Sequence, residues 1–374
     1  MIYLIAEMLE SLGGKWEVFR VFQYVSVRAI AASITTLLLI ILFSPSIIRK
    51  LHLSGQRDTQ RDIDINLAKS KRGTPTMGGI IILFSVFISL LLWSNILSHF
   101  IWVIASCMIV FGLLGATDDI SKVRGGHADA GLSRTSKLLV QGLFGIALGM
   151  FLYFPITSPF SAGIADTVGV PFIKPASMGG FDIHLGWGYI FFVAFVVMAI
   201  SNAVNLIDGL DGLAAGTTLP PVMVYAVFAY ILGNIKMSEY LLYNFMPGVH
   251  ELVVFAAALI GALIGFLWYN GYPAEVFMGD TGSLALGGML AAMVLLTKQE
   301  LLFIIAGGLF FYVNVTHLIG DRIGINLLGR RIFYRTPIHH SYEHLGIAET
   351  KVSLRFAIVA LVLAMLSLAT LKIR

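Results

Sequence analysis

Long apolar runs recur along the whole chain, and they restrict its fold more than any other feature. Runs of roughly 17 to 25 residues can cross the 30 Å hydrocarbon core of a membrane. Lipid offers no hydrogen bonds to the backbone, so each run is predicted to be a helix. We predict an all-α integral membrane protein with about ten membrane-spanning helices, at 25–48, 77–94, 100–117, 137–155, 187–206, 214–233, 250–268, 284–297, 301–319 and 353–372.

The composition argues against a soluble globular domain. Only 12% of the residues are charged and 57% are hydrophobic, whereas about a quarter of a soluble domain is charged. The single cysteine, Cys107, excludes an intrachain disulfide. Residues 1–24 carry scattered charges and are predicted to be a surface lead-in segment. No Pro-rich linker or internal repeat divides the chain, so residues 1–374 are predicted to form one polytopic membrane domain.

The positive charges fall mainly on one side of the predicted membrane. The loops that follow odd-numbered spans, with Lys137 and Arg355 beside them, hold 17 of the 25 Lys and Arg. The positive-inside rule places that side in the cytoplasm. The longest loop of the other side, 156–186, is rich in Gly and Pro and is predicted to be a short extracytoplasmic hairpin or turn.

All the polar motifs of the chain lie on the predicted cytoplasmic side. They are "KRGTPTMGG" (71–79), "GATDDISK" (115–122), "NLIDGLDG" (205–212), "NGYPAEVFMGDTGS" (270–283) and "RTPIHHSYEHLG" (335–346). Ionisable groups at a membrane boundary are costly unless they have partners or a function. Their gathering on one side therefore predicts an active site with cytoplasmic loops.

The acidic residues of these motifs favour a hard metal ion. Asp118 and Asp119 are adjacent, and two such carboxylates repel each other unless a cation or a proton is present. Asp208, Asp211 and Asp280 are candidates to join them. Several carboxylates beside Asn side chains, without cysteine, are typical of Mg²⁺ sites that a phosphate completes. A solvated acidic helix end is the alternative for the Asp pair by itself.

Other motif residues are candidates for phosphate and base recognition. The Gly/Ser/Thr turns at 73–79 and 279–283 precede helices, whose free amides bind phosphate or serve as ordinary caps. Lys122 and Lys137 flank the loop after the Asp pair, and membrane anchoring is the alternative for such basic residues. His339 lies in a basic loop and is a candidate phosphate contact, whereas His340 and His344 fit hydrogen-bonding roles, because their spacing is not that of a zinc site. Phe277 lies in a polar loop and could stack on a ring.

Together these motifs resemble those of the phospho-N-acetylmuramoyl-pentapeptide transferases of bacterial peptidoglycan synthesis. The resemblance rests on "KRGTPTMGG", "DD" with "GLSRTSKL" downstream, "NAVNLIDGLDGLA", "FLWYNGYPAEVFMGDTGSLALGG" and "PIHHSYEHLG", and covers about residues 30–372. The wider superfamily of polyprenyl-phosphate N-acetylhexosamine-1-phosphate transferases shares the Asp-Asp and Asn-x-x-Asp motifs. "GTPTMGG" and "PIHH" favour the muramoyl branch.

The resemblance implies a reaction and a location. Phospho-MurNAc-pentapeptide would pass from UDP-MurNAc-pentapeptide to undecaprenyl phosphate, giving lipid I and UMP, with Mg²⁺ as the cofactor. The protein would be a multi-pass protein of the bacterial inner membrane, among membrane lipids, as a homodimer and without a nucleic-acid partner.

The resemblance also implies roles for individual residues. Asp280 and Asp208 would bind the metal, Asp118 would act as the base toward the lipid phosphate, and Asp119 would support it. His339 would be the fourth catalytic residue. The implied substrate-binding residues are Lys71, Thr76, Lys122, Lys137, Asn205, Asp208, Asp211, Asn270, Phe277 and His340. One departure is that Ser341 and Tyr342 stand where the family usually has a third His and a Phe, which puts a role for that third His in doubt.

Two other functions remain compatible with the sequence alone. A transferase of the same superfamily could use UDP-GlcNAc as its donor instead. A cation or nucleotide-sugar transporter would also bury acids, but near the middle of the membrane and often in two related halves.

Overall fold

The computed structural model describes residues 1–12, 14–55, 73–126, 130–161, 163–327, 329–330 and 332–373 of the chain. Most of the described part is helical, and eight of its helices are long and apolar enough to cross a membrane. They are α2 (Val25–Leu53), α5 (His99–Gly125), α6 (Arg134–Tyr153), α7 (Gly188–Ile207), α8 (Leu213–Leu232), α10 (Glu251–Asn270), α11 (Gly279–Leu296) and α15 (Glu349–Ala369). The all-α membrane fold is therefore confirmed.

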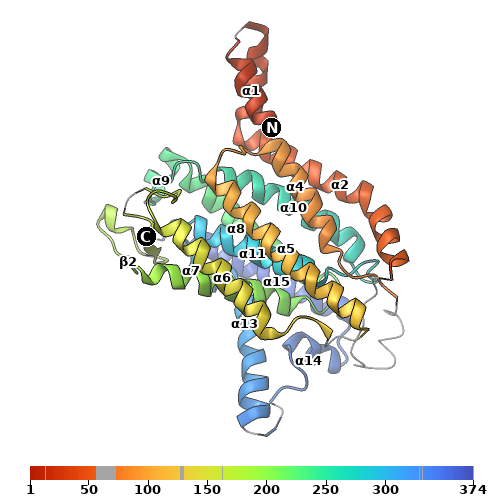
Figure 1. Cartoon of the computed structure of the whole chain (residues 1–374). Coiled ribbons are helices and arrows are strands. Elements are labelled where there is room, and N and C mark those ends of the chain that lie inside the picture. Colours follow the sequence, from red (N-terminus) through yellow and green to blue (C-terminus); the bar gives the residue numbers. More distant parts are fainter. Residues whose placement is uncertain are drawn as a thin grey trace.

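The two remaining predicted spans are helical but differ from a full straight crossing. Helix α4 (Gly79–Trp93) has 15 residues and is about 22 Å long at 1.5 Å per residue. The run 301–319 is divided into α12 (Phe303–Ala306) and α13 (Gly308–Leu318), which continues into the π-helix η4 (Ile319–Leu327). Figure 1 shows α13 extending away from the bundle.

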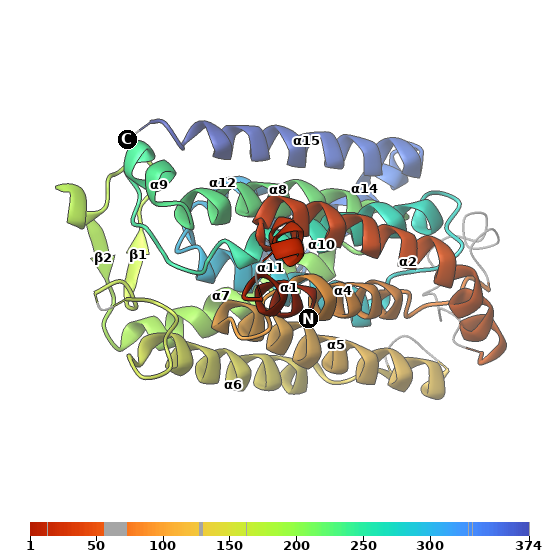
Figure 2. The same cartoon turned by 90° about the horizontal axis from the view of Figure 1, so that it is seen from above.

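Short elements complete the described chain. They are α1 (Ile2–Glu10), the 3-10 helices η1 (Gly14–Gln23) and η3 (Ala176–Met178), α9 (Ile235–Leu241) and α14 (Ile338–His344). Strands β1 (Thr167–Gly169) and β2 (Asp182–His184) pair antiparallel, with Thr167 opposite His184. The hairpin predicted within 156–186 is present. In Figure 2 the hairpin lies at one end of the bundle, and α14 lies at the other.

Helix α11 is the centre of the bundle. Every residue from Thr281 to Leu296 is buried, and the helix packs against α4, α5, α7 and α8. Small residues permit this, as in other membrane helix pairs. A Cβ on Gly282 would lie 2.8 Å from the Cα of Gly79, and one on Gly287 would lie 2.5 Å from the Cα of Ser201. These two glycines of α11 thus bring α4 and α7 close to its axis.

A buried ion pair joins α2 to α10. The Arg28 guanidinium donates to both oxygens of Glu251, at 2.8 and 2.7 Å, and both side chains are almost fully buried. A bidentate pair of this kind fixes geometry as well as neutralising charge. Together with hydrogen bonds from the Thr36 hydroxyl to the Ala258 carbonyl and from the Tyr269 hydroxyl to the Ile41 carbonyl, it sets the register between these two helices.

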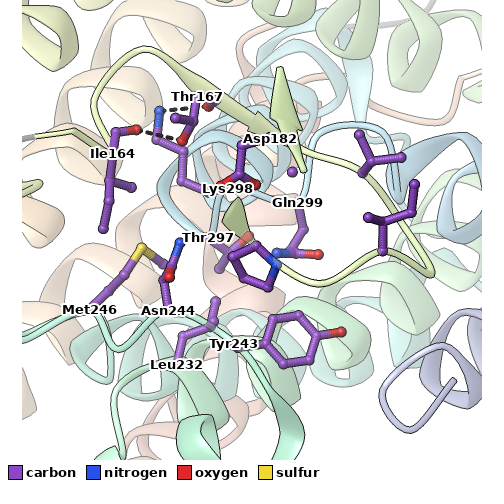
Figure 3. A pocket seen from close by; sticks show the side chains of 14 residues that line it. Ile164, Thr167, Asp182, Leu232, Tyr243, Asn244, Met246, Thr297, Lys298 and Gln299 are labelled. Atoms are coloured by element: carbon purple, nitrogen blue, oxygen red, sulfur yellow. Dashed lines mark hydrogen bonds between the residues drawn. The ribbon is translucent and has the colours of Figure 1, made fainter. Parts of the chain in front are cut away.

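A second polar cluster fastens the hairpin to the bundle. The buried Lys298, in the turn after α11, donates to the carbonyl oxygens of Ala165 and Thr167 at 2.8 and 3.3 Å. Its ammonium lies 3.8 Å from the ring centre of Tyr189. A small cavity of about 30 Å³ lies beside this cluster, and Lys298, Gln299, Thr167 and Asp182 are among the residues that line it (Figure 3). This cluster lies at the hairpin end, away from the acidic motifs.

Candidate active site

Three carboxylates from two helices meet at the end of the bundle opposite the hairpin. Asp118, Asp119 and Asp280 each offer an oxygen, and these oxygens all lie within 4.8 Å of one another. Asp118 and Asp119 belong to α5, which continues to Gly125. The helix therefore continues past residue 117, the predicted end of the third span, and the prediction that the Asp pair lies in a loop was wrong.

A close approach between α5 and α11 brings the carboxylates together. A Cβ on Gly115 would lie 2.1 Å from the carbonyl oxygen of Asp280, so only glycine allows the two backbones to approach this closely. Asp280 itself occupies the first turn of α11, because this helix begins at Gly279 and not at the predicted residue 284. The backbone contact therefore sets how far Asp280 lies from the Asp pair.

Asp119 serves as an N-terminal cap for α11. Its two oxygens accept hydrogen bonds from the backbone amides of Asp280 and Thr281, at 3.0 and 2.9 Å, and from the Thr281 hydroxyl at 2.6 Å. These amides belong to the first turn, whose donors have no partner within the helix. Asp119 thus fixes the backbone that carries Asp280.

Two lysines lie between Asp118 and Asp280. Lys122 Nζ is 2.7 Å from Asp118 Oδ2 and 3.1 Å from Asp280 Oδ2. Lys137 Nζ, from α6, is 2.8 Å from the same atom of Asp118 and 2.7 Å from the same atom of Asp280. The prediction placed both lysines at the Asp pair, and the structure brings them there. Positive and negative groups alternate in a small, half-buried volume, which suits a pair of phosphates with a cation.

Asn205 reaches the same centre from the last turn of α7. Its side-chain amide donates to Asp280 Oδ1 and to the Ser283 hydroxyl, both at 2.9 Å. Helices α5, α6, α7 and α11 therefore each supply one or more polar groups around Asp280.

The first motif lies against the motif that precedes α11. The amide of Phe277 donates to the Pro75 carbonyl, and the amides of Gly78 and Gly79 donate to the carbonyls of Phe277 and Met278. Thr76 is buried in this contact, and a Cβ on Gly279 would lie 2.8 Å from its hydroxyl oxygen. Lys71, the other residue predicted from this motif, lies outside the described residues.

The remaining acids of the site differ in their surroundings. Asp208 ends α7 and is partly buried, but it is not among the three grouped carboxylates, so its part in metal binding stays a prediction. Asp211 is buried and accepts from the amide of Ala274 at 3.1 Å. Asn270 is also buried and links the amide of Gly212 to the carbonyl of Val276. Phe277 is partly buried.

The His motif packs over the turn that follows Asp208. His339 is fully buried, and a Cβ on Gly209 would lie 2.4 Å from its Nε2. Burial and the neighbouring His340 lower the pKa of His339 to about 3, so its ring is neutral at physiological pH. Any contact it makes with a phosphate would be a neutral hydrogen bond. His340 is partly exposed, and its Nδ1 lies 2.8 Å from Glu343 Oε2.

Ser341, which stands where the family usually has a third His, has a structural role in this protein. The Ser341 hydroxyl accepts from the amide of Arg335 and donates to the Arg335 carbonyl, at 2.9 and 2.5 Å. Ser341 therefore closes the turn that leads into α14.

Sequence reasoning gave no role to three residues that hold the site. The "GDTGS" motif contains Thr281 and Ser283 but predicts no role for either, and Glu349 lies outside every motif. Thr281 binds Asp119, Ser283 binds Asn205, and Glu349 binds the backbone of Asp211. The one sequence feature that could have pointed to Glu349 is its position as an acid in the first turn of a helix that follows a basic loop.

The three grouped carboxylates fit a hard divalent cation. Their donors are all oxygens, which Mg²⁺ prefers, and a single such ion usually takes one or two carboxylates together with phosphate and water. The two lysines that bridge Asp118 and Asp280 show that this space already holds positive charge. The residues present therefore suit a Mg²⁺ ion together with anionic substrates.

Comparisons with known proteins agree with this site. The family model described as glycosyl transferase family 4 matches residues 101–298, and the phospho-N-acetylmuramoyl-pentapeptide-transferase signature 1 matches residues 71–83. Fold and site thus define a polytopic membrane transferase of family 4.

Relatives along the whole length narrow the family further. The phospho-N-acetylmuramoyl-pentapeptide-transferase of Syntrophus aciditrophicus is 41% identical over 99% of this chain and 100% of its own length. The proteins of that name from Methylacidiphilum infernorum and Maridesulfovibrio salexigens are 43% and 40% identical, and each match covers at least 98% of both chains. The chain belongs to the phospho-N-acetylmuramoyl-pentapeptide transferase family.

Proposed function

We propose that this protein transfers phospho-MurNAc-pentapeptide from UDP-MurNAc-pentapeptide to undecaprenyl phosphate, forming lipid I and UMP in peptidoglycan synthesis. The single observation that carries the proposal is full-length similarity to transferases of this name. The gathering of the acidic and basic motif residues at one end of the bundle supports it.

The proposed chemistry is a direct phosphoryl transfer. An oxygen of the lipid phosphate forms a bond to the sugar-bearing phosphorus while the bond from that phosphorus to the UMP oxygen breaks, and UMP leaves. Asp118 takes or orients the proton of the lipid phosphate. Lys122 and Lys137 offset the repulsion between the two anionic substrates and the charge that develops on the leaving UMP.

We assign Mg²⁺ as the cofactor, held by Asp280 with Asp208 and aided by Asp118 and Asp119. When bound, the ion neutralises phosphate oxygens and makes UMP a better leaving group. Asp119 keeps Asp280 in place through its hydrogen bonds to the first turn of α11.

The nucleotide would bind beside the turn that follows α7. Asn205 and Asp208 face the phosphates, and Phe277, which is partly buried, stacks on the uracil ring. Asp211, Asn270 and Thr76 support these residues through the backbone contacts already described. His339 and His340 complete the wall above Gly209.

The setting of the enzyme is part of the same proposal. We assign the protein to the bacterial inner membrane with its active site toward the cytoplasm, as a homodimer among membrane lipids. Residues 1–374 would form one membrane domain, since a single large hydrophobic core cluster includes residues from α2 to α15.

A UMP-release assay tests the proposal. Purified protein in detergent is given undecaprenyl phosphate with either UDP-MurNAc-pentapeptide or UDP-GlcNAc, with and without Mg²⁺. We expect UMP only from the muramoyl donor and only with Mg²⁺. Release from UDP-GlcNAc alone would instead identify the other branch of the superfamily, and uptake of nucleotide into proteoliposomes without UMP would identify a transporter.

A further inference from the structure

The turn between α7 and α8 is held from the side of the C-terminal helices. This turn consists of residues 208–212 and follows directly after Asn205 and Asp208. Gly212 has a φ of +72°, which reverses the chain just before α8. Residues of α14 and α15 contact the turn at two points, at Gly209 through His339 and at Asp211 through Glu349. In Figure 2, α14 and the start of α15 lie at the same end of the bundle.

The side chains of Glu349 and Ser353 both hydrogen-bond to the backbone of Asp211. The amide of Asp211 donates to Glu349 Oε1 at 2.8 Å, and the Ser353 hydroxyl donates to the carbonyl of Asp211 at 3.0 Å. The two side chains are four residues apart on α15 and therefore share one face of the helix. Glu349 is only 6% exposed, so its hydrogen bond to the Asp211 amide is shielded from solvent.

The opposite side of the turn is tied to the loop before α11. The Asp211 carboxylate accepts from the amide of Ala274, and the Asn270 side chain accepts from the amide of Gly212. The turn is thus clamped between α15 and the loop that leads to Asp280. The amides of Asp208 and Gly209 donate to backbone carbonyls of α7, whereas those of Asp211 and Gly212 donate to the Glu349 and Asn270 side chains.

We infer that Glu349 is a positioning residue of the active site, which fixes the 208–212 turn and thereby the end of α7 that carries Asn205 and Asp208. This inference rests on the proposed assignment of Asp208 to the nucleotide and metal side. A carboxylate suits the position because the first-turn amides of α15 favour negative charge. A glutamine can also accept the Asp211 amide, whereas an alanine leaves a buried amide unpaired.

The test compares Glu349→Ala with Glu349→Gln. With alanine we expect kcat/KM for UDP-MurNAc-pentapeptide to fall about tenfold or more, while the KM for undecaprenyl phosphate stays within about twofold of wild type. Glutamine should retain kcat/KM within about threefold. Lys351→Ala, on the same turn of α15 but exposed, is the matched control and should be unchanged.

Hydrogen–deuterium exchange supplies a readout that does not depend on activity. In Glu349→Ala the amides of residues 208–212 should exchange faster, and in Glu349→Gln they should not. If Glu349→Ala fails to fold, Ser353→Ala can be used in its place. It removes only the hydrogen bond to the Asp211 carbonyl and should raise the exchange of residues 208–212 by a smaller amount.

Two results would overturn the inference. One is wild-type exchange and kinetics in Glu349→Ala. The other is a general loss of thermal stability that glutamine does not restore, with both substrates affected alike, which indicates a purely structural role. Asp208→Asn separates the two proposals: full turnover in that variant removes the role of Asp208, whereas the exchange result alone decides whether Glu349 fixes the turn.

Discussion

Asp119 and Asp280 show how one carboxylate can hold another in a candidate metal site. Both oxygens of Asp119 accept hydrogen bonds from the backbone amides and the Thr281 hydroxyl at the start of α11. Asp280 instead contacts two lysines and Asn205. Two acids that are adjacent in the sequence thus make different contacts, because Asp118 and Asp119 lie on different faces of α5. Asp118 faces the lysines, and Asp119 faces α11.

All three carboxylates should be essential for turnover. We expect Asp118→Asn, Asp119→Asn and Asp280→Asn each to lower kcat by at least about 10³-fold, the upper range for losing a preorganised electrostatic contact. Asp119→Asn loses activity because an amide nitrogen cannot accept the bonds that Thr281 donates. UMP release measures this, with Glu239→Gln on the exposed face of α9 as the control. Wild-type turnover in any of the three would refute that residue's role.

His339 should make stability depend on pH. Its pKa is about 3 in the folded protein and about 6.5 in an unfolded chain. Below pH 6.5 the unfolded chain binds a proton that the folded protein does not, so stability is lost as the pH falls from 6.5 toward 3. From pH 7 to pH 5, wild type should lose about 2 kcal/mol more than His339→Gln. Unfolding in detergent at both pH values measures the difference, and an equal loss would contradict the burial of a neutral ring.

The sequence predicted which residue types meet at the site, but not how they are held. Asp118, Lys122 and Lys137 were foreseen together because charge and motif pointed to one chemistry. Thr281 and Glu349 were not, since each acts through backbone atoms of a residue distant in the sequence, and no composition or spacing records that proximity.

At the scale of helices, close packing around α11 places the chemistry and Lys298 fastens the far end. Burial lowers the pKa of Lys298 to about 8 and raises that of the nearby Glu300 to about 7. The bonds from Lys298 to Ala165 and Thr167, together with one from the Ser177 hydroxyl to Asn244, are polar links of the hairpin to the bundle within the described residues.

Removing this lysine should loosen the hairpin. In Lys298→Met two carbonyls lose their donor and Glu300 loses its neighbouring positive charge, which we expect to lower stability by about 3 kcal/mol. Hydrogen–deuterium exchange should rise at residues 164–170. Lys236→Met, which alters an exposed lysine of α9, serves as the control. Unchanged exchange in Lys298→Met would mean that the apolar contacts of the hairpin suffice.

Hydropathy predicted the helices well and their ends poorly. Each predicted span is helical because lipid leaves the backbone no alternative. The helix of the third span extends beyond residue 117, and the helix of the eighth span begins before residue 284. Both differences arise because the polar residues Asp118 and Asp280 lie within helices, where contacts between α5 and α11 hold them. The break before α13 was also missed, because Gly307 and Gly308 resemble any small residues of a membrane helix.

For the whole molecule, the arrangement separates a catalytic end from a hairpin end. Figure 2 shows the strands at one end and α14 with the ends of α2 and α5 at the other. The hairpin residue Ser177 and the α5 residue Arg124 are both exposed, at opposite ends. The positive-inside rule predicts that the Arg124 end faces the cytoplasm.

Cysteine labelling tests this sidedness. Cys107 is the only native cysteine, and it is buried, so an introduced cysteine gives a clean signal. Ser177→Cys should react with a membrane-impermeant maleimide in intact spheroplasts, and Arg124→Cys only in inverted vesicles. The reverse pattern would place the active site outside the cytoplasm.

Acids from separate helices are proposed to hold one divalent ion, and Mn²⁺ binding measures this directly. Titration of the purified protein, with free Mn²⁺ followed by electron paramagnetic resonance, should give one bound ion per chain. Asp280→Asn should weaken that binding by at least about tenfold, as expected when a ligand is lost from a metal site. Undiminished Mn²⁺ binding in Asp280→Asn would mean that Asp280 is not a ligand of the ion.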